Sequence, residues 1–156
     1  MWAGDYSYYS APYFRATANS FNYNYWSSSV GFKSTGSTNT SFSVKNQLLD
    51  GRNTATPVAI TNFGPSPYYA DTAPTPADPL KISSYWLWKF NGTSDLYDAW
   101  IKIEEDTPLY PGEGYTMKGS LGDVAVVTNQ NYTYRGKPNN GNIDTLKLKA
   151  GNDRLI

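Results

Sequence analysis

The chain of 156 residues contains no cysteine and no histidine. Iron–sulfur clusters, haem ligation, ordinary zinc sites and the Ser-His-Asp and Cys-His catalytic arrangements each need a thiolate or an imidazole. Most hydrolase chemistry is therefore excluded, and we expect a protein that is not an enzyme. The absence of cysteine suits a cytosolic protein as well as a bacterial surface protein.

An excess of charge of either sign is also lacking. The 13 Lys and Arg residues balance 13 Asp and Glu residues, and the basic residues are scattered singly. Such a chain has no cluster of basic residues that would attract nucleic acid or an anionic membrane. No apolar run reaches the ~18 residues of a membrane span, and the first residues lack the basic and apolar regions of a signal peptide. We expect no nucleic-acid partner, no direct membrane insertion, and any secretion signal to lie outside this chain.

Aliphatic residues are scarce, because Leu, Ile, Val and Phe together make less than a fifth of the chain. That fraction alone is typical of disordered sequences. However, 14 Tyr and 5 Trp raise the aromatic fraction to 16%, and zero net charge removes the repulsion that keeps a chain open. A chain of this length forms about one domain. We therefore expect a single domain over residues 1–156 with an aromatic core, and Trp86, Trp88 and Trp100 are the candidate core residues.

Apolar and polar positions alternate through much of the chain, whereas no long stretch has a 3.6-residue period. This pattern predicts an all-β protein. Short strands at a spacing of about 10 residues are typical of a sandwich, so we predict an antiparallel β-sandwich that is jelly-roll-like. The predicted strands are residues 21–30, 40–47, 55–63, 81–90, 100–104, 114–118, 124–128, 132–136 and 142–149.

Turn signals and irregular segments separate these strands. Residues 1–19 are aromatic-rich without strand periodicity and are predicted to be an irregular lead-in. Residues 64–79 hold half of the chain's 10 prolines and predict a Pro-rich surface loop. The alternative is a disordered linker between two domains, which the small size of the flanking halves disfavours. Four residue pairs that favour turns are Asp50-Gly51, Asn91-Gly92, Pro111-Gly112 and Asn140-Gly141.

The segment of residues 21–26 (FNYNYW) is the most distinctive candidate site. Alternation along a strand places the rings of Phe21, Tyr23 and Tyr25 on one face, and the other face carries Trp26 and two amides. An exposed row of rings is a platform for sugar rings, which stack through their C–H faces while amides bond their hydroxyls. The alternative is that the same row packs in the core. The candidate ligand-binding residues are Tyr23, Tyr25, Asn22 and Asn24.

Acidic residues offer two further kinds of site. A glycosidase needs only two carboxylates, so the lack of histidine does not exclude one. The available acids are Asp95, Asp98, Glu104, Glu105 and Asp106, but adjacent acids at a strand end usually face water, and we predict no catalytic residue. Calcium needs several converging oxygen ligands, and the chain has no EF-hand loop. Asp95 and Asp98 are the candidate ligands of a structural calcium ion, and no other cofactor is expected.

Several segments in one order carry a family resemblance. They are residues 25–31 (YWSSSVG), residues 82–86 (ISSYW), Trp100, residues 109–119 (LYPGEGYTMKG) and residues 132–143 (YTYRGKPNNGNI). Over residues 20–156 the chain resembles a β-rich domain of large secreted and surface adhesin-like proteins of Bacteroidota, especially flavobacteria, that the type IX secretion system exports. The PGEGYTMKG and GKPNNG blocks are the most specific, because each combines several turn-forming residues at fixed spacing.

The resemblance implies an extracellular or cell-surface location and a non-catalytic role in adhesion or in the assembly of a cell-surface structure. The implied partners are a glycan or a protein at the cell surface, or neighbouring subunits. Two alternatives stay open, a carbohydrate-binding module of a secreted polysaccharide-degrading protein and a filament subunit. The resemblance also implies that the chain is part of a longer protein, and that Thr72 and Thr145, each in an Asp-Thr-apolar pattern, carry O-linked glycans.

Overall fold

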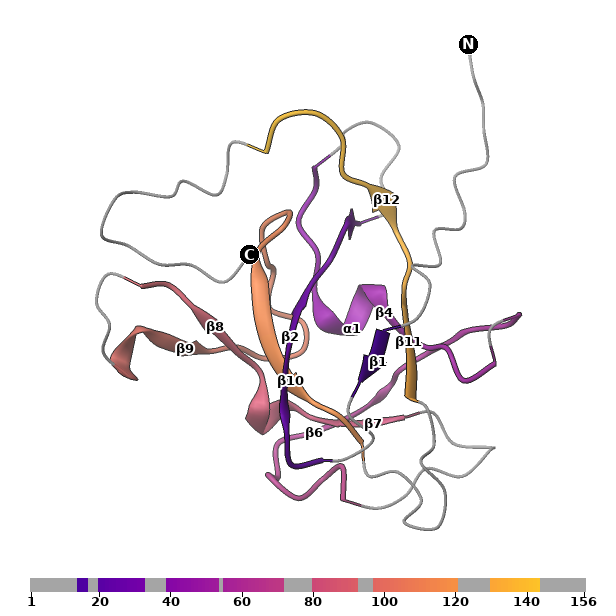
Figure 1. Cartoon of the computed structure of the whole chain (residues 1–156), viewed down its shortest axis with the longest axis vertical. Coiled ribbons are helices and arrows are strands. Elements are labelled where there is room, and N and C mark those ends of the chain that lie inside the picture. The colour runs from indigo at the N-terminus through magenta and orange to yellow at the C-terminus, as the bar shows by residue number, and fades with distance from the viewer. Residues whose placement is uncertain are drawn as a thin grey trace.

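The computed structural model describes residues 14–16, 20–32, 39–53, 55–71, 80–92, 97–120 and 130–143. In these ranges the protein is rich in strands and has one α-helical turn, α1 (Val44–Gln47). Two four-stranded sheets pack together, and two shorter strand pairs complete the fold (Figure 1). The predicted all-β, sandwich-like class is confirmed. No helix in this part of the chain is long and apolar enough to cross a membrane.

The first four-stranded sheet is antiparallel throughout. Its strand order is β2 (Tyr23–Ser27), β10 (Gly114–Lys118), β8 (Trp88–Phe90) and β9 (Trp100–Lys102). The register places Tyr25 opposite Thr116, and Thr116 opposite Trp88. Strand β10 has the bounds that the alternation predicts, and β2 and β9 lie within predicted strands.

The second four-stranded sheet is also antiparallel. Its order is β1 (Phe14–Ala16), β11 (Gln130–Tyr134), β4 (Leu48–Asp50) and β5 (Val58–Ala59). Strand β12 (Lys137–Pro138) pairs with β3 (Val30–Gly31), and β6 (Asn62–Gly64) runs parallel to β7 (Lys81–Ser83). The β6–β7 pair therefore departs from the purely antiparallel prediction. The irregular lead-in predicted for residues 1–19 is also wrong in part, since it contains β1.

Aromatic side chains from both sheets meet in the core. Trp26 of β2 packs edge-on against Tyr132 of β11, with ring centroids 5.3 Å apart. The hydroxyls of Tyr115, from β10, and Tyr134, from β11, lie 2.7 Å apart and form a buried hydrogen bond. Burial raises the pKa of both phenols above the ordinary value, so both hydroxyls stay protonated at neutral pH. These contacts confirm the expected aromatic component of the core.

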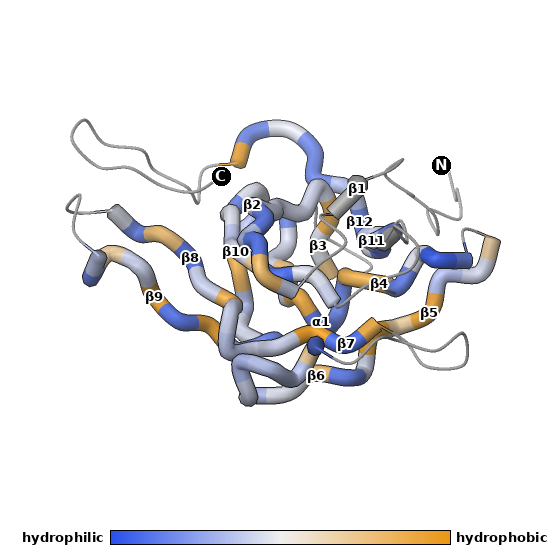
Figure 2. Tube along the Cα trace, turned by 60° about the horizontal axis from the view of Figure 1, so that its bottom comes forward, coloured by the Kyte–Doolittle hydropathy of each residue, from blue (hydrophilic) through white to orange (hydrophobic). Residues whose placement is uncertain are grey.

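Aliphatic side chains fill the rest of the core. Figure 2 shows hydrophobic stretches of β3, β4 and β7 gathering near α1, and all four elements contribute to one cluster of buried residues. The aliphatic members of this cluster are Val30, Val44, Leu48, Ile60, Leu80, Ile82, Leu87, Ile103, Leu109 and Met117. Among the described residues, most of the Leu, Ile and Val side chains are thus buried.

The prediction that Trp86, Trp88 and Trp100 form the core is wrong, because all three are only partly buried and lie outside that cluster. The cause is a break in the strand predicted over residues 81–90. A 3₁₀ turn, η1 (Ser84–Trp86), separates β7 from β8. In an unbroken strand Ile82 and Leu87 point to opposite faces, because they are an odd number of positions apart. The turn allows both to face the core, and the tryptophans then face outward.

The strand predicted over residues 40–47 is also wrong. Phe42 makes only an isolated bridge to Leu109, and α1 follows. The side-chain oxygen of Gln47 accepts a hydrogen bond of 2.7 Å from the backbone N–H of Ser43, which satisfies a donor at the start of the helical turn. Val44 and Leu48, four residues apart, are both fully buried. A short apolar alternation such as this one does not distinguish a strand from a single helical turn.

The other predicted strands are shorter than expected or lie elsewhere. Residues 21–30 divide into β2 and the start of β3, and residues 55–63 divide between β5 and β6. Strand β11 begins two residues before the predicted 132–136 segment. The prediction for residues 124–128 lies outside the described residues, as does that for residues 142–149 apart from 142 and 143, which are not in a strand.

Two of the four predicted turns begin hairpins, although the connections are longer than the sequence suggests. Asp50-Gly51 leads from β4 into β5, and Asn91-Gly92 leads from β8 toward β9. At Pro111-Gly112 the N–H of Glu113 bonds the carbonyl of Tyr110 at 2.9 Å, and Gly112 has φ 76°. This is the geometry of a type II turn, whose third position favours glycine. Gly141 also has a positive φ, of 72°.

The first part of the predicted Pro-rich loop packs against η1. The indole N–H of Trp86 donates to the carbonyl of Pro67 at 2.9 Å, and the Ser83 hydroxyl donates to the carbonyl of Ser66 at 2.7 Å. Residues 65–70 form successive bends and turns at the surface, as predicted. Residues 72–79 lie outside the described residues.

We expect Tyr134→Phe to lower the free energy of unfolding by about 1–3 kcal/mol, because it leaves the buried hydroxyl of Tyr115 without this partner. Urea denaturation measures the loss. The double variant Tyr115→Phe/Tyr134→Phe removes both hydroxyls and should recover part of the stability. A double variant no more stable than the single one would contradict a mutual hydrogen bond.

At the turn before β10, Gly112→Ala should cost about 1–2 kcal/mol of stability, because a Cβ is unfavourable at the φ of 76° found there. Gly112→Asn is the matched control, since asparagine tolerates the left-handed region better than alanine does. Thermal unfolding followed by near-ultraviolet circular dichroism measures both variants. Equal losses for alanine and asparagine would show that the backbone conformation does not set the cost.

Candidate functional site

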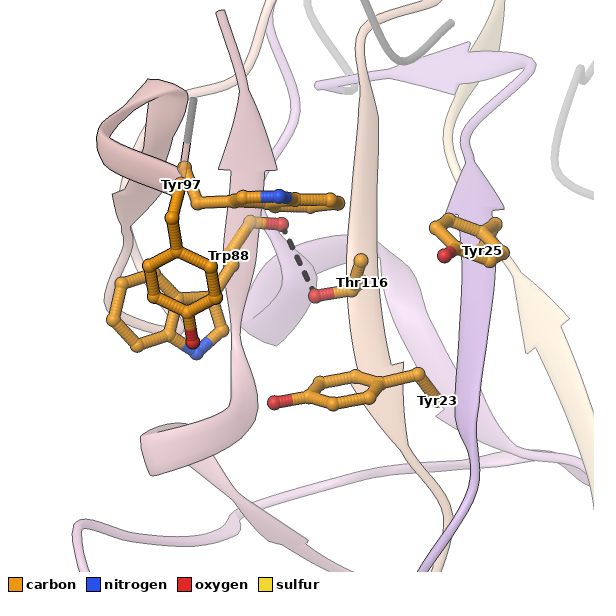
Figure 3. A pocket seen from close by; sticks show the side chains of 6 residues that line it. Tyr23, Tyr25, Trp88, Tyr97 and Thr116 are labelled. Carbon is orange, nitrogen blue, oxygen red and sulfur yellow. Dashed lines mark hydrogen bonds between the residues drawn. The ribbon is translucent and has the colours of Figure 1, made fainter. Parts of the chain in front are cut away.

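An aromatic pocket lies on the outer face of the first sheet. Its volume is about 210 Å³. Tyr23 and Tyr25 come from the strand on one side of Thr116, and Trp88 and Tyr97 come from the other side, while the Tyr23 ring extends below Thr116 (Figure 3). Among the described residues, those that line this pocket, which we call the aromatic pocket, are Tyr23, Tyr25, Trp88, Tyr97, Trp100 and Thr116.

Strand alternation in β2 produces the first wall. Tyr23 and Tyr25 are 44% and 67% exposed, whereas Trp26 is 6% exposed and points into the core. Phe21, just before the strand, is also exposed. The row of rings therefore faces outward, and the alternative that it packs in the core is wrong. Trp26, which alternation places on the opposite face of β2, already occupies the core, so Tyr23 and Tyr25 face outward.

Strand β10 supplies the floor. Its residues Tyr115 and Met117 are fully buried on the core side, which leaves Thr116 on the outer side. The Thr116 hydroxyl lies 3.4 Å from the carbonyl of Trp88, to which it donates a hydrogen bond (Figure 3). A small side chain in the middle of the sheet leaves open space between the larger rings on the neighbouring strands.

The second wall comes from β8, β9 and the 3₁₀ turn η2 (Tyr97–Ala99). The indole N–H of Trp88 donates to the carbonyl of Tyr85 at 3.1 Å, which restricts this ring. Trp100 packs against Phe90 with ring centroids 5.1 Å apart. Tyr97 is the most exposed member of the lining. Trp88 and Trp100 are core residues in the sequence-based prediction, which includes neither Tyr97 nor Thr116 among the site residues.

A second group of rings supports Tyr23 from behind. Trp86 meets Tyr23 edge-on at 5.8 Å between ring centroids, and Tyr85 meets Trp86 at 4.6 Å. The Lys118 ammonium lies 3.5 Å from the Trp86 centroid and 4.8 Å from the Tyr23 centroid, which is a cation–π arrangement. Burial lowers the pKa of Lys118, and the charge of Asp71 opposes that shift.

The Tyr23 phenol is neutral in this environment. Partial burial raises its pKa above the ordinary value, and the neighbouring Tyr97 and Tyr85 add to the shift. A neutral phenol both donates and accepts hydrogen bonds. The wall thus offers hydrogen-bonding groups as well as ring faces.

The two asparagines predicted to accompany the rings do not line the aromatic pocket. Alternation places Asn24 on the opposite face of β2 from Tyr23 and Tyr25. Its partner on β10 is Met117, whose side chain faces the core. The side-chain amide of Asn24 donates to the carbonyl of Asn22 at 3.4 Å. Asn22 precedes β2 and is exposed. The structure therefore brings the predicted rings together with other aromatic residues instead of with these amides.

The remaining predicted sites receive little structural support. Asp98 is exposed in η2, and Asp95, Thr72 and Thr145 lie outside the described residues. Among the residues described, no group of three or more acidic residues is arranged to hold a metal ion. Glu104 forms an exposed ion pair of 2.8 Å with Lys102.

Two buried carboxylates have structural roles. Asp50 pairs with Arg52 at 2.7 Å and accepts a 3.0 Å hydrogen bond from the N–H of Leu80, which links β4 to the start of β7. Glu113 pairs with Lys89 at 3.3 Å and accepts from the N–H of Tyr110 at 2.9 Å, which closes the turn before β10. Neither carboxylate lines the aromatic pocket.

Comparison of the chain with family models, curated proteins and solved structures finds no match. The functional interpretation therefore rests on the aromatic pocket and the residues that position it.

Proposed function

We propose that the protein is a non-catalytic domain that binds carbohydrate in the aromatic pocket. The observation that carries this proposal is the lining itself, in which five aromatic side chains surround the hydroxyl of Thr116 on the outer face of a sheet. We further propose that the domain works outside the cell, in adhesion or in the assembly of a bacterial surface structure. The sequence resemblance supports that setting.

Sugar chemistry matches this lining. A pyranose ring presents C–H groups on its faces, and these stack on aromatic rings, while its hydroxyls need hydrogen-bonding partners at the edges. The walls supply ring faces from both flanking strands. The phenol hydroxyls of the tyrosines supply polar contacts around them.

Part of each wall is held in place before any ligand binds. Trp88 is fixed by its hydrogen bond to Tyr85, and Tyr23 is held by Trp86 and Lys118. A pre-organised site loses less conformational entropy on binding than a mobile one. Exposed rings on a rigid sheet also form the kind of apolar patch that marks an interaction site on a soluble protein.

The composition of the lining supports binding without catalysis. Hydrolysis of a glycosidic bond requires a pair of carboxylates beside the bond, whereas the six lining residues carry none. A module attached to a secreted polysaccharide-degrading protein would use the same pocket. The two settings differ only in the protein to which the domain belongs.

We expect Tyr25→Ala to weaken glycan binding at least about tenfold, which corresponds to about 1.4 kcal/mol, because the variant removes one of the two rings that form the β2 wall. A glycan array identifies the ligand, and isothermal titration calorimetry measures the dissociation constant. The melting temperature should stay close to that of the parent protein, since the Tyr25 side chain is 67% exposed.

Tyr68→Ala is the matched control, because Tyr68 is 76% exposed and does not line the aromatic pocket. This variant should bind like the parent protein. Equal loss in both variants, or full binding by Tyr25→Ala, would place the ligand elsewhere. A blank array together with self-association in light scattering would favour a filament subunit over a glycan-binding domain.

A further inference from the structure

The lining of the aromatic pocket is uncharged in the part of the chain that the structure describes. None of its six side chains is acidic or basic. The faces of aromatic rings carry the negative part of the ring quadrupole, which attracts C–H groups and cations and repels anions. A carboxylate placed among these rings would lose hydration without gaining a cationic partner from the lining, which is costly.

The charged groups near the pocket already have partners or face solvent. Lys102 shares the outer face with Trp88, its partner across the β8–β9 pair, and its ammonium is bound to Glu104 at 2.8 Å.

The Lys118 ammonium lies over the rings of Trp86 and Tyr23. Asp98 is exposed beside Tyr97, and Asp71 lies within electrostatic reach of Lys118.

Tyr23 separates the Lys118 ammonium from the pocket floor. Thr116 and Lys118 are two residues apart on the same face of β10, and Tyr23 pairs with Lys118 across the β2–β10 ladder. The Tyr23 side chain lines the pocket together with Thr116 and also lies under the Lys118 ammonium. The cation therefore stabilises the wall instead of forming part of the lining.

The walls stand on opposite sides of the floor. Tyr23 and Tyr25 project from the strand on one side of Thr116, and Trp88 and Tyr97 project from the other side (Figure 3). A sugar ring that enters between them contacts aromatic groups on both of its faces. In a pyranose with all its ring hydroxyls equatorial, the axial ring positions of both faces carry only C–H groups, whereas an axial hydroxyl places a polar group against one of the walls.

We infer that the aromatic pocket selects an uncharged pyranose whose ring hydroxyls are all equatorial, as in β-linked glucose or xylose. This inference rests on the proposed function and adds the ligand class to it. Epimers with an axial hydroxyl, such as mannose and galactose, bind less tightly, and uronic acids are rejected.

Methyl β-glycosides of glucose, mannose, galactose and glucuronic acid provide the test, because each of the last three differs from the glucoside at a single carbon. Each is titrated into ¹⁵N-labelled protein, and the indole N–H resonances of Trp88 and Trp100 report binding at the pocket itself. The glucoside should shift both resonances with a dissociation constant at least about fivefold lower than those of its neutral epimers. Raising the salt from about 50 to about 500 mM should change that constant less than about twofold, because no ion pair forms.

Two results would overturn the inference and leave the proposed function intact. One is equal affinity for the glucoside and either neutral epimer. The other is tight binding of the glucuronide that weakens with salt and is lost in Lys118→Met, which would make Lys118 an anion-binding residue. If none of the four glycosides shifts any resonance and a glycan array is also blank, both the inference and the proposed function fail.

Discussion

The contact between Tyr115 and Tyr134 fixes how the two four-stranded sheets face each other. Each of these residues comes from an inner strand of its sheet, Tyr115 from β10 and Tyr134 from β11, and their hydroxyls share a buried hydrogen bond. Trp26 adds edge-on ring contact from β2 to Tyr132 of β11. A buried hydroxyl without a partner is costly, so the two sheets have a strong preference for this one alignment.

The position of the aromatic pocket follows from that alignment. Once Trp26, Tyr115 and Met117 occupy the core, strand alternation forces Tyr25 and Thr116 to the outer face. The antiparallel register then places Trp88 beside Thr116. The large rings stand on the flanking strands and a small residue stands between them, so the pocket is a consequence of the same packing that stabilises the domain.

Aromatic residues serve two separate purposes in this protein. Those in the core, such as Tyr115 and Tyr132, are fully buried, and aliphatic side chains surround them. Those on the outer face, such as Trp86 and Trp88, remain partly exposed and are held by hydrogen bonds to backbone carbonyls. The ring faces that remain exposed are the basis of the proposed binding of carbohydrate.

The sequence by itself determined the all-β class, the bounds of β10, the presence of a turn at Pro111-Gly112 and the placement of Tyr23 and Tyr25 on one face of a strand, but not whether that face points inward or outward. Each of these depends on neighbouring residues, because alternation and turn geometry act over a few positions. Only the tertiary structure decided that Trp88, Tyr97 and Trp100 join Tyr23 and Tyr25, since tens of residues separate the two groups along the chain. Strand pairing and the break at η1 bring them together, and alternation cannot specify which strands pair or where a 3₁₀ turn reverses the faces.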